Sequence, residues 1–235
     1  MARRRRKKGF GWGARFFALL ALVAIAAGAW LWWDTRHWTP PESDYPDQGA
    51  LVSQADGAVN FRTLKALGAD FVYLEASTGS DGKDARFARN FEAAREAGLQ
   101  VGAVHVYDPC SVADGQSAGF VTMVPRGADL LPPAIALGRT ADACDEPVPD
   151  AAVASELMTL INQIEMHTGK PVILKLGPRF EAEYGIASRL DRGLWVNRTR
   201  LPPTYAGRPW LLWSANEHLQ TEASDALLEW VVAQP

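Results

Sequence analysis

The chain has 235 residues, of which 48% are hydrophobic and 22% charged. This is the composition of a globular protein with room for one domain and a sizeable core. The net charge of -3 hides a split, because residues 1–38 carry eight Lys or Arg and one acid, Asp34, whereas the rest carries 16 basic and 26 acidic residues. Nucleic-acid phosphates need Lys and Arg, so the acidic body argues against nucleic acid as a partner and assigns the basic run to targeting.

The first predicted element is an apolar helix at residues 16–33, which are 18 residues without a charge. At about 1.5 Å per residue the run spans roughly 27 Å, close to the thickness of a bilayer's hydrocarbon core. Basic residues precede it and tryptophans at 30, 32 and 33 end it, which predicts a single span with its N-terminus in the cytoplasm. A cleaved signal peptide, with Ala27-Gly28-Ala29 at the cleavage site, is the alternative, and both interpretations export the body of the chain.

This division predicts a cytoplasmic basic segment at residues 1–15, a transmembrane anchor at 16–33, a linker at 34–48 and one folded domain at 49–235. The linker is polar and rich in proline, and Pro40-Pro41 should stiffen it. In a bacterium the anchor would cross the inner membrane once and hold the folded domain in the periplasm.

The body alternates helix-like and strand-like stretches. Helical spacing predicts helices at residues 59–67, 85–97, 116–123, 151–167 and 180–184. Short apolar runs predict buried strands at 71–77, 99–107, 130–137, 171–176, 193–199 and 208–215, and residues 225–232 close the chain. The alternation indicates an α/β architecture with parallel strands. A single TIM-like (β/α) barrel fits better than a doubly wound sheet, because no Gly-rich phosphate loop follows the first strand.

Chemical motifs are few. Cys110 and Cys144 lie in polar, turn-like surroundings of the exported body, where an even pair favours a disulfide and two buried free thiols are the alternative. There is no metal-binding spacing such as Cys-x-x-Cys, and no Gly-x-Ser-x-Gly nucleophile elbow. We therefore expect no metal and no cofactor.

Barrel enzymes place their sites at the C-terminal ends of the strands. The candidates at these ends are Glu75, His105, Tyr107, residues 136–138, Lys175, Trp195 and Trp213. Glu75 is either a pocket acid or half of a salt bridge, with Lys175 as a candidate partner. His105 is either a site residue or a hydrogen-bonded core histidine. The tryptophans either stack on sugar rings or fill the core.

Several segments, taken in order, resemble the family 25 glycoside hydrolases, lysozymes (N-acetylmuramidases) that cut peptidoglycan. GADFVYLEASTGSDGKDARFARNFEAAREAGLQVGAVHVY is similar to the family's second strand, helix and third strand, and QSAGFVTMVPRGADLLPPAIALG to the approach to its catalytic motif. KPVILKLGPRF, GLWVNRT and GRPWLLWSA are similar to later strands, and Cys110 and Cys144 fall where a bacterial subgroup has cysteines. The resemblance covers about residues 49–232 and implies an irregular β/α barrel and a muramyl-glycan substrate.

The carboxylates that this resemblance implies are replaced. The family opens with Gly-Ile-Asp-Val-Ser, and residues 49–53 have Leu51 at the Asp. The family's Asp-x-Glu after Pro-Pro corresponds here to Ala136 and Gly138. Glycoside hydrolysis needs one acid to protonate the leaving oxygen and usually a second carboxylate. Leu, Ala and Gly supply neither.

Other family positions differ as well. Glu75 and Thr78 stand where Lys and Glu are usual, and Leu174 stands where Tyr is usual. Trp213-Ser214-Ala215 replaces Trp-Gln-Tyr, and Ser224-Asp225 is the match for a late Val-Asp. These differences extend the divergence beyond the implied acids.

The resulting hypothesis is a membrane-anchored, lysozyme-like pseudoenzyme that binds peptidoglycan or muramyl glycan. Its expected substrate-binding residues are Glu75, His105, Tyr107, Trp195 and Trp213. Two alternatives stay open: an active muramidase that uses other carboxylates such as Glu75 or Asp225, and a module that binds a protein of the cell envelope.

Overall fold

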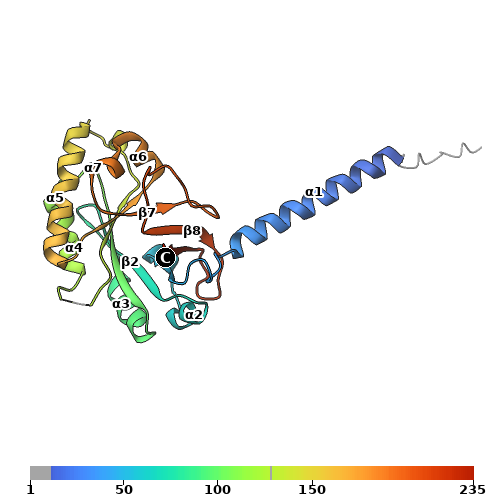
Figure 1. Cartoon of the computed structure of the whole chain (residues 1–235), viewed down its shortest axis with the longest axis horizontal. Coiled ribbons are helices and arrows are strands. Elements are labelled where there is room, and N and C mark those ends of the chain that lie inside the picture. The colour runs from blue at the N-terminus through green and yellow to red at the C-terminus, as the bar shows by residue number, and fades with distance from the viewer. Residues whose placement is uncertain (1–11, 128) are drawn as a thin grey trace, which may run out of the picture.

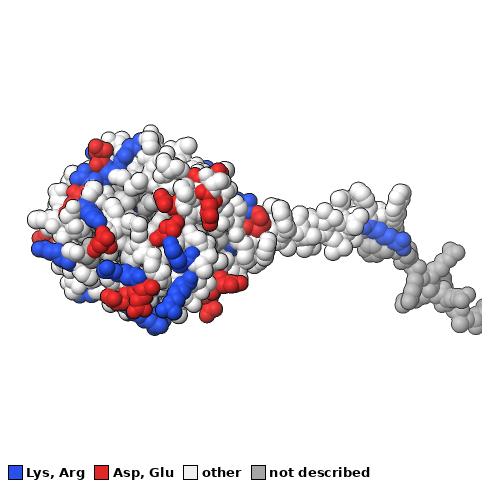
Figure 2. Space-filling model, turned by 60° about the horizontal axis from the view of Figure 1, so that its bottom comes forward, with Lys and Arg blue, Asp and Glu red and all other residues white. Residues whose placement is uncertain are grey.

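The computed structural model describes residues 12–127 and 129–235 (Figure 1). Most of the expected cytoplasmic segment, residues 1–11, lies outside the described residues. Helix α1 (Trp12–His37) leads away from a folded body, and this rod is free of charged side chains over most of its length (Figure 2). Within the described residues, one helix has the length and composition to cross a membrane, at Arg15–His37 with a mean hydropathy of 2.1, and a signal sequence has the same properties.

Eight strands of the body form a closed barrel, as predicted. In chain order they are β1 (Gln48–Val52), β2 (Phe71–Thr78), β4 (Gln100–Val106), β5 (Ala134–Leu137), β6 (Ile173–Leu176), β7 (Gly193–Asn197), β8 (Leu212–Leu219) and β9 (Leu228–Ala233). Neighbours from β1 to β8 run parallel, and the antiparallel β9 pairs with both β8 and β1 and so closes the barrel. The short β3 (Gly82–Lys83) forms a hairpin with the end of β2.

Helices cover the outside of the barrel. They are α2 (Phe61–Ala66), α3 (Phe87–Glu96), α4 (Ala113–Met123), α5 (Asp150–Thr168), α6 (Pro178–Tyr184) and α7 (Ile186–Arg189), with 3-10 turns η1 (Gln54–Asp56) and η2 (Ala141–Ala143). α3 illustrates why they form: Phe87, Phe91 and Ala94 share one buried face, and Gly98 follows with a positive φ that ends the helix.

Side chains on the strands alternate between the barrel interior and the side under the helices. The interior core consists of Phe71, Tyr73, Val104, Ala134, Ile173, Trp195, Leu212 and Val231. Tyr73 and Trp195 pack with ring centroids 5.0 Å apart, and the Tyr73 hydroxyl donates to the carbonyl of Pro132. This packing fills the interior and leaves polar side chains to gather at the mouth, which we define as the C-terminal ends of the parallel strands.

Some element boundaries differ from those predicted. The strand expected at residues 130–137 begins at Ala134, because the prolines before it have no N–H to donate to a ladder. The strand expected at 208–215 is displaced to Leu212–Leu219, and α4 begins at Ala113 rather than at residue 116. The sequence pattern did not predict β1 or β3.

Residues 34–47, which we call the docked segment, do not form the extended linker that their composition predicted. Asn216 on β8 donates from Nδ2 to the carbonyls of Thr35 and Trp38, at 2.8 and 2.9 Å. The last turn of α1 and the residues after it are therefore tied to the barrel wall.

Aromatic packing extends this attachment along β8. The ring centroids of Trp38 and Tyr45 lie 6.4 and 5.6 Å from that of Trp213, and Trp210 packs against Tyr45 at 6.3 Å. Burial of large rings is a strong driving force for packing. It outweighs the preference of a polar, proline-rich stretch for solvent.

Candidate functional site

The mouth of the barrel gathers the positions at which the resemblance implies carboxylates. Leu51 on β1 and Ala136 on β5 both pack against the interior core, and Gly138 directly follows β5. Gly138 is exposed, and a Cβ added there would meet no heavy atom within 4 Å. The mouth therefore brings the three positions to one end of the barrel, and none of them carries an acid.

Four side chains form a polar network beside these positions: Lys175, Trp195, Ser214 and Glu229 (the mouth network). Lys175 Nζ donates to Glu229 Oε2 at 2.8 Å, Trp195 Nε1 donates to Ser214 Oγ at 2.7 Å, and Ser214 donates to Glu229. Lys175 Nζ also lies 5.2 Å from the centroid of the Trp195 ring, within range of a cation–π contact. Because β7 and β8 separate β6 from β9, the ion pair reaches across the barrel.

The charges of this ion pair stand next to two of the replaced positions. Lys175 is opposite Ala136 in the register of β5 and β6, and Glu229 is opposite Leu51 in the register of β1 and β9. Their side chains are 16% and 18% exposed. Lys175 is thus paired with Glu229, and the salt bridge to Glu75 that we considered as an alternative does not form. Glu229 and Ser214 were not predicted as site residues.

Glu75 is half-buried at the mouth and accepts a hydrogen bond from Thr78 Oγ1 at 2.8 Å. Burial raises its pKa, the bond from Thr78 opposes that shift, and the negative charge of Asp84 adds to it. Burial also raises the pKa of Asp56, but its carboxylate accepts from both the N–H and the hydroxyl of Ser53 and so holds η1 in place. Glu75 is the better placed of the two for acid chemistry, since a carboxyl held toward its protonated form can donate a proton.

The other predicted binding residues divide between the two sides of the barrel wall. Trp195 shares the interior with Glu75, whereas His105, Tyr107 and Trp213 are buried on the outer side. Tyr107 donates to the carbonyl of Val153 on α5, and Trp213 donates to the carbonyl of Arg198. The role of these three in sugar binding stays a prediction, and direct contact with a glycan needs movement of the elements that cover them.

His105 is held as a neutral imidazole between β2 and α4. Its Nδ1 lies 2.9 Å from Ser77 Oγ and its Nε2 lies 3.1 Å from Gln116 Oε1. The amide oxygen of Gln116 can only accept, so Nε2 carries the proton. Burial lowers the pKa of His105 to about 4, and the bond to Gln116 partly opposes this shift.

This pKa gives His105 a defined pH signature. A histidine in the unfolded chain has a pKa of about 6.5. Between this pH and a pH of about 4, His105 therefore binds a proton in the unfolded chain but not in the folded chain. The contribution of neutral His105 to stability is present above pH ~6.5 and is lost as the pH falls to the folded pKa. We expect His105→Asn to lower the free energy of unfolding at pH 7 and to remove about 3 kcal/mol of the decline that the unmodified chain shows toward pH 4. Urea unfolding at both pH values measures this, and an equal decline in both proteins refutes it.

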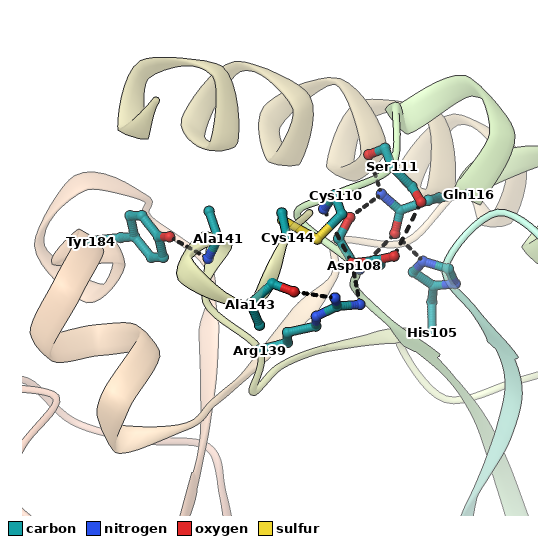
Figure 3. A network of polar contacts seen from close by, with 10 residues as sticks. All are labelled: His105, Asp108, Cys110, Ser111, Gln116, Arg139, Ala141, Ala143, Cys144 and Tyr184. Carbon is teal, nitrogen blue, oxygen red and sulfur yellow. Dashed lines mark hydrogen bonds and ion pairs between the residues drawn. A yellow bond between two sulfur atoms is a disulfide. The ribbon is translucent and has the colours of Figure 1, made fainter. Parts of the chain in front are cut away.

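A cross-linked rim joins the loops that follow β4 and β5 (Figure 3). Cys110 and Cys144 form the predicted disulfide, which joins the loop after β4 to the loop after β5. Arg139 reinforces the connection, because its Nη1 lies 2.9 Å from Asp108 Oδ1 and its Nη2 donates to the carbonyl of Ala143 at 2.9 Å. Arg139, the residue directly after Gly138, is therefore tied to both loops of the rim.

Removal of the disulfide is expected to destabilise the chain. The bridge spans a sequence separation of 34 residues, and closing a loop of this length stabilises the folded chain by about 4 kcal/mol. The Cys110→Ser/Cys144→Ser variant should have a free energy of unfolding that is lower by this amount, and so a lower urea midpoint. The unmodified chain should show the same midpoint when reductant is added. If the variant has the same urea midpoint as the oxidised chain, the disulfide does not contribute to the stability of the fold.

The sequence matches a known protein family over most of its length. The model of the family named glycosyl hydrolases family 25 matches residues 52–222. The chain belongs to glycosyl hydrolase family 25. Lysozyme M1 of Streptomyces globisporus is 39% identical over 62 residues, which make up 26% of this chain and 21% of that protein. The match to this lysozyme thus spans about a fifth of its length.

Solved structures of the family have the same barrel. A family 25 glycosyl hydrolase from Bacillus anthracis superimposes with a TM-score of 0.76 at 25% identity, over 85% of this chain and 93% of that one. The bacterial lysozyme from Streptomyces coelicolor has a TM-score of 0.69 at 20% identity, over 80% of this chain and 92% of its own. The family and the fold predicted from the sequence are confirmed. In residues 12–127 and 129–235 there is no group of three or more His, Cys, Asp or Glu that could hold a metal.

Proposed function

We propose that this family 25 protein is anchored in a membrane and binds the muramyl glycan of peptidoglycan without cleaving it. The proposal depends on one observation: at the mouth, Leu51, Ala136 and Gly138 occupy the positions of the implied acids. General acid catalysis alone is worth roughly 10²–10⁴-fold. Loss of the acid and of the second carboxylate together removes the chemistry and leaves the scaffold.

Glycan binding is supported by the family and by the groups that remain at the mouth. The relatives include proteins named as lysozymes, whose substrate is peptidoglycan. Glu75 offers a half-buried carboxyl at the mouth, and Gly138 on the rim leaves open space where a side chain would go. A partly exposed carboxyl at the mouth is suited to accept hydrogen bonds from sugar hydroxyls.

Sedimentation with purified peptidoglycan tests this binding. The full chain in detergent micelles should pellet with the wall, and Glu75→Ala should weaken retention. Glu183→Ala, which changes an exposed acid on α6, is the matched control and should leave retention unchanged. No retention of the unmodified chain, even at low salt, would instead favour a protein partner in the envelope.

An active muramidase is the second candidate, and the raised pKa of Glu75 is the observation that favours it. A general acid must reach the leaving oxygen within about 3 Å. Loss of turbidity of a peptidoglycan suspension measures this activity. Turbidity loss that Glu75→Gln abolishes would establish the second candidate and overturn the non-catalytic part of the first.

The anchoring part of the proposal takes α1 as an uncleaved span, with residues 1–15 in the cytoplasm and the barrel in the periplasm. The apolar length of α1 supports it, as do the basic residues before the span. The intact mass of the protein extracted from bacterial membranes tests it. A mass that lacks residues 1–29 would establish cleavage of a signal peptide.

A further inference from the structure

The apolar part of α1 meets the barrel without a spacer. The last residue of the apolar run is Trp33, and the next one, Asp34, forms an ion pair with Arg200. The carbonyl of Arg36 accepts from the backbone N–H of Gln220 at 2.7 Å. At about 1.5 Å per helical residue, these contacts begin within roughly 5 Å of the end of the apolar run. The barrel is therefore fixed against the end of the proposed span.

These contacts lie at the mouth end of the barrel. Arg200 comes three residues after the end of β7 and Gln220 directly follows β8, and both strands run toward the mouth. The docked segment then passes down the outside of β8, where Tyr45 packs on Trp213, and enters β1 at the opposite end. Figure 1 shows α1 leading away from the barrel beside the end of β8, with α5 on the far side.

We propose that the mouth end of the barrel faces the bilayer and that the site binds a muramyl saccharide carried on a membrane lipid, rather than strands of the cross-linked wall. This inference rests on the proposed anchoring and glycan binding. A wall polymer has to enter the thin layer between the mouth and the lipid headgroups, whereas a lipid-linked saccharide already lies in it. Confinement of both molecules to one bilayer also raises their effective concentration.

The loop between β7 and β8 carries the groups that such a position requires. Leu201 is 60% exposed although it is apolar, and its neighbours Pro202 and Arg198 are exposed as well. An apolar side chain close to a cation matches the boundary between acyl chains and anionic headgroups. Arg198 is also placed to meet the phosphate groups that join a saccharide to its lipid carrier.

Spin labels test the orientation. The chain contains two cysteines and both are in the disulfide, so one added cysteine gives a single labelling site. Leu201→Cys and, at the far side, the exposed Met166→Cys on α5 are labelled in separate samples of the full chain in nanodiscs. Nickel chelated to lipid headgroups should relax the label at 201 several-fold more than the label at 166. Equal relaxation at the two positions, or stronger relaxation at 166, overturns the orientation.

Binding in the same nanodiscs tests the ligand class. The membrane probe is a muramyl disaccharide joined through a diphosphate to a polyprenyl lipid, and the soluble probe is the same saccharide without lipid. We expect the lipid-linked probe to bind about tenfold or more tightly. Arg198→Gln should reduce this advantage, and Arg189→Gln on α7 should not.

The outcomes separate this inference from the proposed function. Equal binding of the two saccharide probes, or tighter binding of purified wall fragments, overturns the lipid-linked ligand and leaves glycan binding standing. A different outcome is that no saccharide binds while the label at 201 is still close to the headgroups. This result overturns both the proposed glycan binding and the lipid-linked ligand, and it supports only the orientation of the barrel.

Discussion

The Ala136→Asp/Gly138→Glu variant is expected to hydrolyse peptidoglycan at a rate about 10²-fold or more above the background of the unmodified chain. The reason lies in the mouth. Gly138 has open space where a side chain would go, and Arg139, the next residue, is tied to the cross-linked rim. Ala136 points into the barrel beside Lys175, whose ammonium would stabilise a new carboxylate. The variant would regain both carboxylates that glycoside hydrolysis needs.

A variant of equal shape controls for this gain. Ala136→Asn/Gly138→Gln introduces side chains of nearly the same size that cannot donate a proton as acids, and it should stay at background. Release of soluble muropeptides from labelled peptidoglycan measures all three proteins. The double-acid variant could have the circular dichroism spectrum of the unmodified chain and still release no soluble muropeptides. In that case, Ala136 and Gly138 are not the reason why the chain does not hydrolyse peptidoglycan.

Glu229→Gln is expected to lower the free energy of unfolding by about 3 kcal/mol. Glu229 accepts from Lys175 and Ser214, and the Lys175 side chain is only 16% exposed. Neutralising the carboxylate leaves the ammonium in a poorly solvated mouth without a counter-charge. Urea unfolding of the full chain in micelles, followed by tryptophan fluorescence, measures the loss.

The double variant Lys175→Met/Glu229→Gln isolates the cause. It removes both charges and keeps a side chain of similar length at position 175, so it should be more stable than Glu229→Gln alone. An unchanged urea midpoint for Glu229→Gln would mean that water or another acid compensates Lys175, and that the ion pair does not hold the mouth.

The parallel part of the barrel could be predicted from the sequence because buried strands are continuous apolar runs. Residues 71–77 and 99–107 match β2 and β4 closely. β1 was not predicted because it begins with Gln48-Gly49 directly after a polar, proline-rich stretch. The packing of the docked segment on the barrel was not predicted, because the composition of this segment is that of a linker. The presence of Trp38 and Tyr45 was the signal against a linker.

The site could be predicted only in part. The resemblance placed Leu51, Ala136 and Gly138 at one end of the barrel, and the structure agrees. Partners far apart in sequence could not be predicted, because they depend on strand register. Lys175 and Glu229 are 54 residues apart, and no local pattern links them. His105 and Tyr107 lie in an apolar stretch of sequence. This stretch does not indicate whether their side chains face the interior of the barrel or the helices outside it.

We expect this family 25 protein to bind muramyl glycan and to leave its glycosidic bonds intact. The most direct measurement is the number of new reducing ends in purified peptidoglycan after prolonged incubation with the full chain, compared with a heat-inactivated sample. We expect no increase while the protein is retained on the wall glycan or on its lipid-linked precursor. An increase that disappears with Glu75→Gln would contradict it and identify an active muramidase.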